Sequence, residues 1–207
     1  MEKYHIPLQP GRYYHLFNHS VGDELLFKTA DNFQFFLKKY ILHTGNICDT
    51  FGYTLMPNHF HFAIKIKSKE ECEVQFKKIK DFPFDSQKHS LSDFLMERFG
   101  NLCNSYTKSY NKVYERKGGL FIDYLKRAKI DSDKYFCNLI NYIHFNAVHH
   151  GFCKKPLDWK WTSLHTFLAN KKTRIKIAEV LEKFGSIDKF KIAHVKMVAP
   201  LPVYEFI

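Results

Sequence analysis

Two histidines separated by one residue, His59 and His61, stand inside the segment LMPNHFHFAI at residues 55–64. The surrounding residues are typical of a buried strand, in which successive side chains point to opposite faces of a sheet. The apolar residues at alternate positions from 60 to 66 would therefore pack on one face, and both imidazoles would lie on the other. Two neighbouring imidazoles on one sheet face indicate either a solvated edge or a metal site.

A second polar group lies on the helix that we predict over residues 132–150. Asn138, Tyr142 and Asn146 recur at every fourth position, so they form one ridge along that helix. Imidazole nitrogens and a carboxamide oxygen can hold Mn²⁺ or Mg²⁺ and leave positions open for phosphate oxygens. A phenol one helical turn away could then act as a nucleophile on a phosphodiester.

Each of these features also has a simpler interpretation. Paired strand histidines are more often partly exposed side chains than metal ligands. Tyr142 could be a boundary tyrosine with a hydrated hydroxyl, and Asn146 could bond the carbonyls at the helix end. His144, His149 and His150 are competing ligand candidates. Spacing alone leaves these alternatives open, and the metal hypothesis rests on the conjunction of the features.

The elements that must position these residues follow from hydrophobic periodicity and turn residues. Strands are predicted at residues 12–18, 47–55, 59–66 and 120–130, and helices from residue 31, from Ser90 and over 132–150. Pro57 and Asn58 supply the turn of a hairpin that ends just before His59. The order β-α-β-β-α-β-α indicates an α+β fold, with an antiparallel sheet covered by helices.

The remaining segments are interpreted as connections and a tail. Residues 67–90 are charged and contain Pro83, which favours an irregular exposed connection. Asp131 or Ser132 caps the helix of residues 132–150. Two or three short helices follow Pro156, with a stop and restart at Gly185 and Ser186.

The charge of the chain is strongly positive. Its 32 Lys and Arg against 21 Asp and Glu give a net charge of +11 and a pI near 9.3. Two segments hold most of the excess, 107–130 and 151–177. Such clusters are expected for a polyanionic partner such as nucleic acid, and charge alone is equally compatible with a merely soluble basic protein. The bases that could follow a phosphate backbone beside the last predicted strand are Arg116, Lys117, Lys126, Arg127 and Lys129.

The composition of the 207 residues, 45% hydrophobic and 17% aromatic, is sufficient for a core. No apolar run is long enough to span a bilayer, and the first residues lack the apolar region of a signal peptide, so we expect a cytoplasmic protein. The five cysteines are scattered and form no C-x-x-C pair. They are interpreted as reduced core residues.

Several segments carry a family resemblance. The strand histidines that flank a bulky apolar residue resemble the HUH motif (histidine, hydrophobe, histidine) of single-strand DNA endonucleases and transposases. In chain order, five segments resemble the REP-associated tyrosine transposases, which are relatives of the single-tyrosine insertion-sequence transposases: LMPNHFHFAI, NSYTKSYNK, GGLFIDYLKRAKI, YIHFNAVHHGF and DWKWTSLHTFL. The ordered series with a Y-I-x-x-N segment is specific, whereas H-x-H alone is weak.

The resemblance assigns roles to individual residues. His59 and His61 become ligands of a divalent metal, Mg²⁺ or Mn²⁺, and Asn146 becomes the third protein ligand. Tyr142 becomes the nucleophile. The family usually has proline directly after the asparagine, where this chain has Ala147. That departure leaves the reactive groups intact and bears only on the geometry of the helix end.

The resemblance also implies a fold and an activity. It implies an RRM-like (ferredoxin-like) α+β domain over residues 1–170, with a C-terminal helical extension over 171–207 packed on it. Such enzymes cleave and rejoin single-stranded DNA beside hairpins folded from short palindromes, through a 5′-phosphotyrosine link and a free 3′-hydroxyl. The long extension favours a monomer over a homodimer.

A different class of function competes with this one, namely a non-catalytic nucleic-acid-binding module on an RRM-like sheet. RRM proteins stack bases on aromatic residues of an exposed sheet face. Histidines at positions 59 and 61 of this chain argue against that alternative without excluding it.

Overall fold

The computed structural model describes residues 4–122, 124–169 and 172–196. In this part of the chain, four antiparallel strands form one sheet: β1 (Tyr13–His19), β2 (Cys48–Leu55), β3 (His59–Ile66) and β4 (Lys126–Ile130). Their spatial order is β2-β3-β1-β4. That order and the β-α-β-β-α-β sequence of elements are those of a ferredoxin-like sheet. The predicted α+β fold is confirmed.

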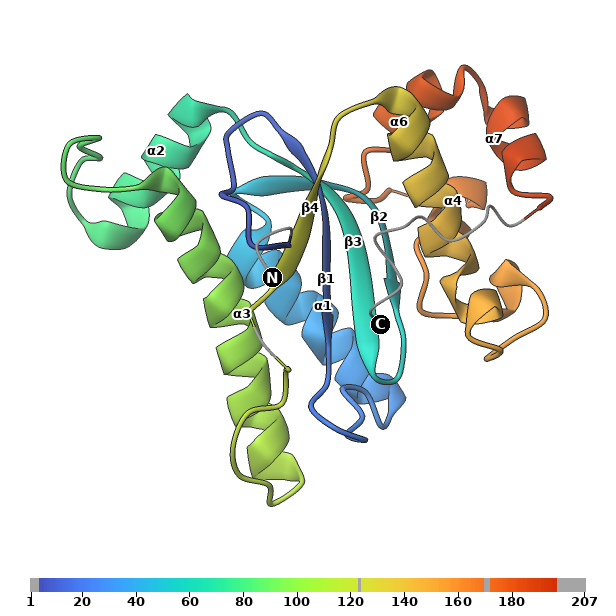
Figure 1. The fold of residues 1–207 in the computed structure, drawn as a ribbon, viewed down its shortest axis with the longest axis horizontal. Coiled ribbons are helices and arrows are strands. Elements are labelled where there is room, and N and C mark those ends of the chain that lie inside the picture. The colour runs from blue at the N-terminus through green and yellow to red at the C-terminus, as the bar shows by residue number, and fades with distance from the viewer. Residues whose placement is uncertain (1–3, 123, 170–171, 197–207) are drawn as a thin grey trace.

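Helices cover both faces of the sheet (Figure 1). The longer ones are α1 (Ala30–Thr44), α2 (Lys69–Lys80), α3 (Leu91–Val113) and α4 (Asp133–His149). α1 and α3 pack on one face, in a core with Phe36, Phe62 and Phe99 at its centre. α4 packs on the other face, where Phe51 and Ile140 are fully buried. The sheet is therefore buried on both sides, which explains why β3 carries almost no exposed residue.

A helical tail packs on α4. Its elements are η2 (Pro156–Asp158), α5 (Leu164–Leu168), α6 (Ile177–Phe184) and α7 (Ile187–Ala193). Val180 of α6 and Phe190 of α7 are buried against the α4 side of the core. The proposed extension of residues 171–207 is thus seen only in part, since Lys171 and residues 197–207 lie outside the described residues. None of the described helices is long and apolar enough to cross a bilayer.

The prediction of an irregular connection over residues 67–90 was wrong for its first half, which forms α2. Ser68 caps this helix by accepting a hydrogen bond from the Glu71 backbone, and the Glu71 carboxylate accepts one from the Ser68 backbone. This reciprocal pair is a capping box. Cys72 and Phe76, one turn apart, are the buried stripe. The S-x-x-E pattern is present in the sequence, but the many charged residues around it favoured the prediction of an exposed connection.

Other boundaries agree closely with prediction. Ser90 and Ser132 cap α3 and α4, and Gly185 ends α6 in a left-handed conformation directly before the Ser186 cap of α7. The last strand is shorter than the predicted 120–130, because regular pairing with β1 begins only at Lys126.

A candidate active site on the histidine face of the sheet

The strand register places the two predicted metal ligands beside further histidines. In the antiparallel pair of β1 and β3, His19 lies opposite His59 and Phe17 lies opposite His61. Directly opposed residues share a face, so one face of the sheet carries His15, Phe17, His19, His59 and His61. We call this the histidine face. β3 is an internal strand and both of its histidines are buried, which excludes the solvated-edge interpretation.

The turn between β2 and β3 fixes the first of these histidines. The Met56 backbone N–H donates to the His59 carbonyl at 2.8 Å, and the Ser20 N–H donates to the Asn58 carbonyl at the same distance. The Asn58 side-chain oxygen lies 2.8 Å from His59 Nδ1. A carbonyl oxygen accepts hydrogen bonds, so this contact puts the His59 proton on Nδ1 and its lone pair on Nε2.

Helix α4 brings the other two predicted residues over the same face. Asn146 Oδ1 lies 3.0 Å from His59 Nε2. The Asn146 side chain also shares a hydrogen bond with the Tyr142 hydroxyl, and the Tyr142 ring meets the His61 ring edge-on with centroids 5.5 Å apart. The structure therefore brings together four residues: His59, His61 and Asn146, which the family resemblance predicts as metal ligands, and Tyr142, which it predicts as the nucleophile.

Burial controls the protonation of these groups. It lowers the pKa of His59 to about 3, with the nearby His150 adding a smaller effect in the same direction. The pKa of His61 is held well below its usual value, first by burial and then by the neighbouring histidines. Both imidazoles are neutral near pH 7 and keep a lone pair to offer. Burial also raises the pKa of Tyr142, against a smaller lowering by the hydrogen bond that it shares with the Asn146 side chain.

The donor set fits a divalent cation. With the His59 proton on Nδ1, two lone-pair atoms, His59 Nε2 and Asn146 Oδ1, face each other at 3.0 Å. That contact is repulsive unless a cation or a proton lies between the atoms. Ligand atoms about 2.1 Å from an octahedral ion are themselves about 3.0 Å apart. The Asn146 amide nitrogen is buried and has no hydrogen-bond partner among the described residues.

The candidate for a third protein ligand is the amide of Asn146. Across residues 4–122, 124–169 and 172–196, no three histidine, cysteine, aspartate or glutamate side chains are grouped as a ligand set. A site made of His59, His61 and Asn146 thus offers two nitrogens and one neutral oxygen. Such a set leaves the full charge of Mg²⁺ or Mn²⁺ for anionic oxygens of a substrate.

His15 orients His61 from the neighbouring strand. His15 Nε2 lies 2.9 Å from His61 Nδ1, and burial lowers the pKa of His15 to about 3. Donation from His61 Nδ1–H to His15 Nε2 leaves the His61 lone pair on Nε2. Partners of this kind fix the tautomer and ring orientation of metal-binding histidines.

Of the three competing ligand candidates, His144 is engaged elsewhere, whereas His149 and His150 lie near the site. His144 points away from the histidine face, with Nε2 2.9 Å from Ser163 Oγ and Nδ1 2.8 Å from His194 Nε2. Both of its nitrogens are engaged, so it is not a candidate ligand here. His150 remains close, with its ring centroid 4.7 Å from that of His59, and the His149 ring lies 6.2 Å from the Tyr142 ring.

The predicted DNA-contacting bases divide into two groups. The Arg127 side chain is buried and donates to the carbonyls of His5, Ile6 and Leu125. Arg116 bonds Glu24 at 2.8 Å and also donates to the Asn111 side chain of α3 and to the Gly119 carbonyl. Both guanidinium groups hold the fold together, which argues against phosphate contacts by either.

The lysines among these bases are more available. Lys117 and Lys129 are exposed and Lys126 is half-buried. Lys126 pairs with Phe17 and therefore shares the histidine face, whereas Lys129 pairs with Tyr14 and faces the opposite side. Lys126 is thus the base of the predicted set that lies on the candidate active-site face.

Sequence reasoning missed two residues of this site, His15 and His19. His15 lies in the predicted strand of residues 12–18, but His19 lies one residue beyond it. Because β1 extends to His19, the two residues are four positions apart in one strand and share a face. Ala147, where the resembling family usually has proline, lies inside α4, which continues to His149.

The sequence matches no protein-family model and no curated protein. Among solved structures, the chain is similar to a REP-associated tyrosine transposase bound to a REP hairpin. The TM-score is 0.60 and the sequence identity 14%, over 82% of this chain and 87% of that one. At this identity, the likeness shows that the two chains share a fold.

Proposed function

We propose that this protein is a single-strand DNA endonuclease and strand transferase of the tyrosine-transposase type, acting at hairpin-containing sites. The observation that carries the proposal is the contact chain His59–Asn146–Tyr142, which joins the H-x-H strand to the tyrosine helix. The shared fold with a hairpin-bound tyrosine transposase supports it.

In the proposed reaction, the Tyr142 oxygen attacks the phosphorus of a DNA phosphodiester. The bond from phosphorus to the 3′ oxygen breaks, the phenol loses its proton, and the departing 3′ oxygen gains one. The products are a 5′-phosphotyrosine and a 3′-hydroxyl. The same hydroxyl, or another, reverses the step and rejoins the strand, so no external energy source is needed.

The phenol has to be assisted in this reaction. Burial raises its pKa above the ordinary value, so Tyr142 is neutral in the resting site. The Asn146 hydrogen bond opposes that shift and fixes the direction of the hydroxyl. His59, His61 and Asn146 would hold the divalent cation. When bound, that cation supplies Lewis-acid polarisation of the phosphodiester.

Access is a further requirement of the proposal. Tyr142 is 2% exposed, so a DNA backbone reaches its hydroxyl only when neighbouring groups are displaced. Lys126, on the same sheet face, could contact the phosphates on the way in. Binding through such contacts weakens steeply with salt.

The RRM-like alternative is less compatible with the fold. An RRM stacks bases on an open sheet face, but here α4 packs against the histidine face and residues such as Ala63 and Phe51 are buried beneath it. We therefore favour the catalytic proposal over a purely binding role.

The test is covalent labelling of the protein on a denaturing gel, in Mn²⁺, by a DNA hairpin with single-stranded flanks that carries a radioactive or fluorescent label at its 3′ end, the part that stays attached to the tyrosine. The wild type should form an adduct and Tyr142→Phe should not, while hairpin binding by the variant stays within about twofold because only a hydroxyl is lost. Tyr135→Phe, on the same helix, is the matched control. An adduct of normal yield in Tyr142→Phe would refute the assignment of the nucleophile.

A further inference from the structure

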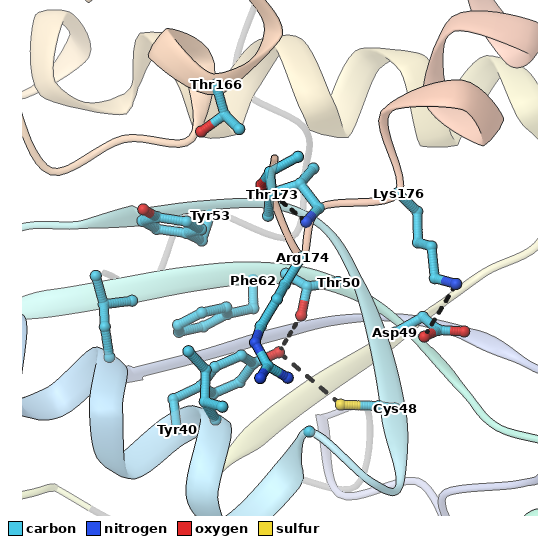
Figure 2. Close-up of a pocket in the computed structure, with 14 residues that line it drawn as sticks. Tyr40, Cys48, Asp49, Thr50, Tyr53, Phe62, Thr166, Thr173, Arg174 and Lys176 are labelled. Carbon is cyan, nitrogen blue, oxygen red and sulfur yellow. Dashed lines mark hydrogen bonds and ion pairs between the residues drawn. The ribbon is translucent and has the colours of Figure 1, made fainter. Parts of the chain in front are cut away.

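A pocket of about 490 Å³ opens beside β2, on the opposite side of the sheet from the histidine face. β2 and Phe62 of β3 form its floor, α1 forms one wall, and the segment of residues 173–176 lies over it (Figure 2). Phe62 lies between His61 and Ala63 in its strand, so it points away from them. The volume is within the range of small-ligand sites, about 300–1,000 Å³.

The floor of this pocket is a row of aromatic rings. The rings of Tyr40 and Phe62 are stacked, with centroids 4.2 Å apart and planes 16° apart. Tyr53 continues the row, 5.8 Å from Phe62 with planes 29° apart. The Tyr40 hydroxyl is fixed by Thr50 at 2.7 Å. Tyr40 and Phe62 are buried, and Tyr53 is the partly exposed ring of the row, so Tyr53 offers the flat apolar surface on which a planar ring can stack.

The upper wall is basic and is held in place by backbone bonds. Thr50 and Ile175 form a parallel bridge, and the Lys176 N–H donates to the Thr50 carbonyl at 2.9 Å. The carboxylate of Asp49, the acidic group of the lining, is neutralised by Lys176 at 3.5 Å and Lys67 at 3.8 Å.

Arg174 is the remaining cation of the lining. Figure 2 shows its side chain reaching down from the 173–176 segment over the aromatic floor. No hydrogen bond or ion pair ties it to any residue that the structure describes. Its guanidinium therefore remains available to an anion.

We propose that this pocket binds a nucleotide, with the base against the aromatic floor and the phosphate at Arg174. Only a ligand that is both planar and anionic uses both features, since stacking requires a flat ring and a guanidinium pairs well with phosphate. The nucleotide is either an unpaired residue of a bound DNA strand or a free mononucleotide. The site is separate from Tyr142, so the inference goes beyond the proposed reaction.

The experiment is calorimetric titration of the full chain with each of the four deoxynucleoside monophosphates. Arg174→Glu should weaken binding about tenfold or more, the loss expected for a charge-assisted contact. Lys172→Glu is the matched control, because Lys172 is exposed directly before this segment but does not line the pocket. Ile41→Trp, at a 40% exposed position on α1, should block binding by filling the pocket without changing charge.

A second arm identifies the source of the nucleotide. Hairpins with single-stranded flanks are titrated into each variant in the Tyr142→Phe background, without metal. If Arg174→Glu and Ile41→Trp weaken hairpin binding much more than Lys172→Glu does, the nucleotide belongs to the DNA. If only mononucleotide binding falls, the ligand is a free nucleotide.

Equal effects of Arg174→Glu and Lys172→Glu on both ligands would overturn the proposal, because general electrostatics would then explain the binding. The proposal would also be overturned if Ile41→Trp left the affinity for both the mononucleotides and the hairpins unchanged. Neither outcome bears on Tyr142, whose adduct is measured separately, so failure here is distinguishable from failure of the proposed reaction.

Discussion

His59 on β3 and Asn146 on α4 are 87 residues apart in the chain, yet His59 Nε2 lies 3.0 Å from Asn146 Oδ1. The contact joins the central sheet to the helix that carries Tyr142, and it places two lone-pair donors where one cation can meet both. The proposed chemistry depends on this contact more than on any other in the molecule.

Metal affinity should follow the side chain at position 146. Asn146→Ala removes an oxygen ligand and should weaken Mn²⁺ binding, whereas Asn146→Asp adds a charge and should strengthen it. Electron paramagnetic resonance titration of free Mn²⁺ measures both effects. Asn138→Ala, earlier on the same helix, is the control and should leave affinity unchanged. Equal affinity in all three variants would remove Asn146 from the ligand set.

His15 should act through His61 rather than by touching DNA. His15→Ala leaves the His61 imidazole without its 2.9 Å partner, so its ring and tautomer are no longer fixed. Loss of such a partner commonly costs about 10–100-fold in metal affinity. His165→Ala, which alters a surface histidine bonded to the Trp159 carbonyl, serves as the control. Unchanged Mn²⁺ affinity in His15→Ala would show that the contact is only structural.

Arg127 and Lys126 are neighbours with opposite expected roles. Arg127→Ala breaks bonds from a buried guanidinium to three carbonyls and should lower the free energy of unfolding by about 3 kcal/mol, on the scale of hydrogen bonds to charged groups. Lys126→Ala should leave stability unchanged. It should reduce the slope of log affinity for the hairpin against log salt concentration by about one, the change expected when one phosphate contact is lost. Urea denaturation and salt titrations separate the two, and the reverse pattern would contradict both assignments.

Docking of α7 should weaken in acid. Burial lowers the pKa of His194 to about 4, and its Nε2 accepts from His144 while its Nδ1–H donates to the Phe190 carbonyl. The unfolded histidine titrates near 6.5. Between these values the unfolded chain binds more protons, so stability is complete above pH 6.5 and falls as the pH drops toward 4. Amide exchange of α7 as a function of pH measures this, and His194→Leu should flatten the profile.

The chain should be a monomer in solution. Both edges of the sheet are engaged: the Leu55 and Lys176 N–H groups bond across the β2 edge to Trp161 and Thr50, and His5 bridges to Arg127 on β4. Covered edges have few groups left to pair with a second sheet. Light scattering should give the mass of one chain at micromolar concentration. A stable dimer would show that association uses another surface.

The local order of this fold could be predicted from the sequence. Period-two alternation locates β3 and places both histidines on one face, and serine caps and glycine stops locate the ends of α3, α4 and α6. These signals are legible because they depend on residues within a few positions of each other. Even α2 was encoded in this way, by the Ser68–Glu71 capping box and by Cys72 and Phe76.

What the sequence could not decide was which distant residues meet. Register alone sets His15 beside His61 and His19 beside His59, and packing alone brings Asn146 to His59 and turns His144 toward Ser163. The burial of Arg127 and the pocket under Arg174 likewise depend on chain segments far apart. By itself, the sequence determined the elements and the chemical types of the side chains. The tertiary structure decided their partners, because contacts across a sheet and between helices depend on registers and crossing positions that no local pattern specifies.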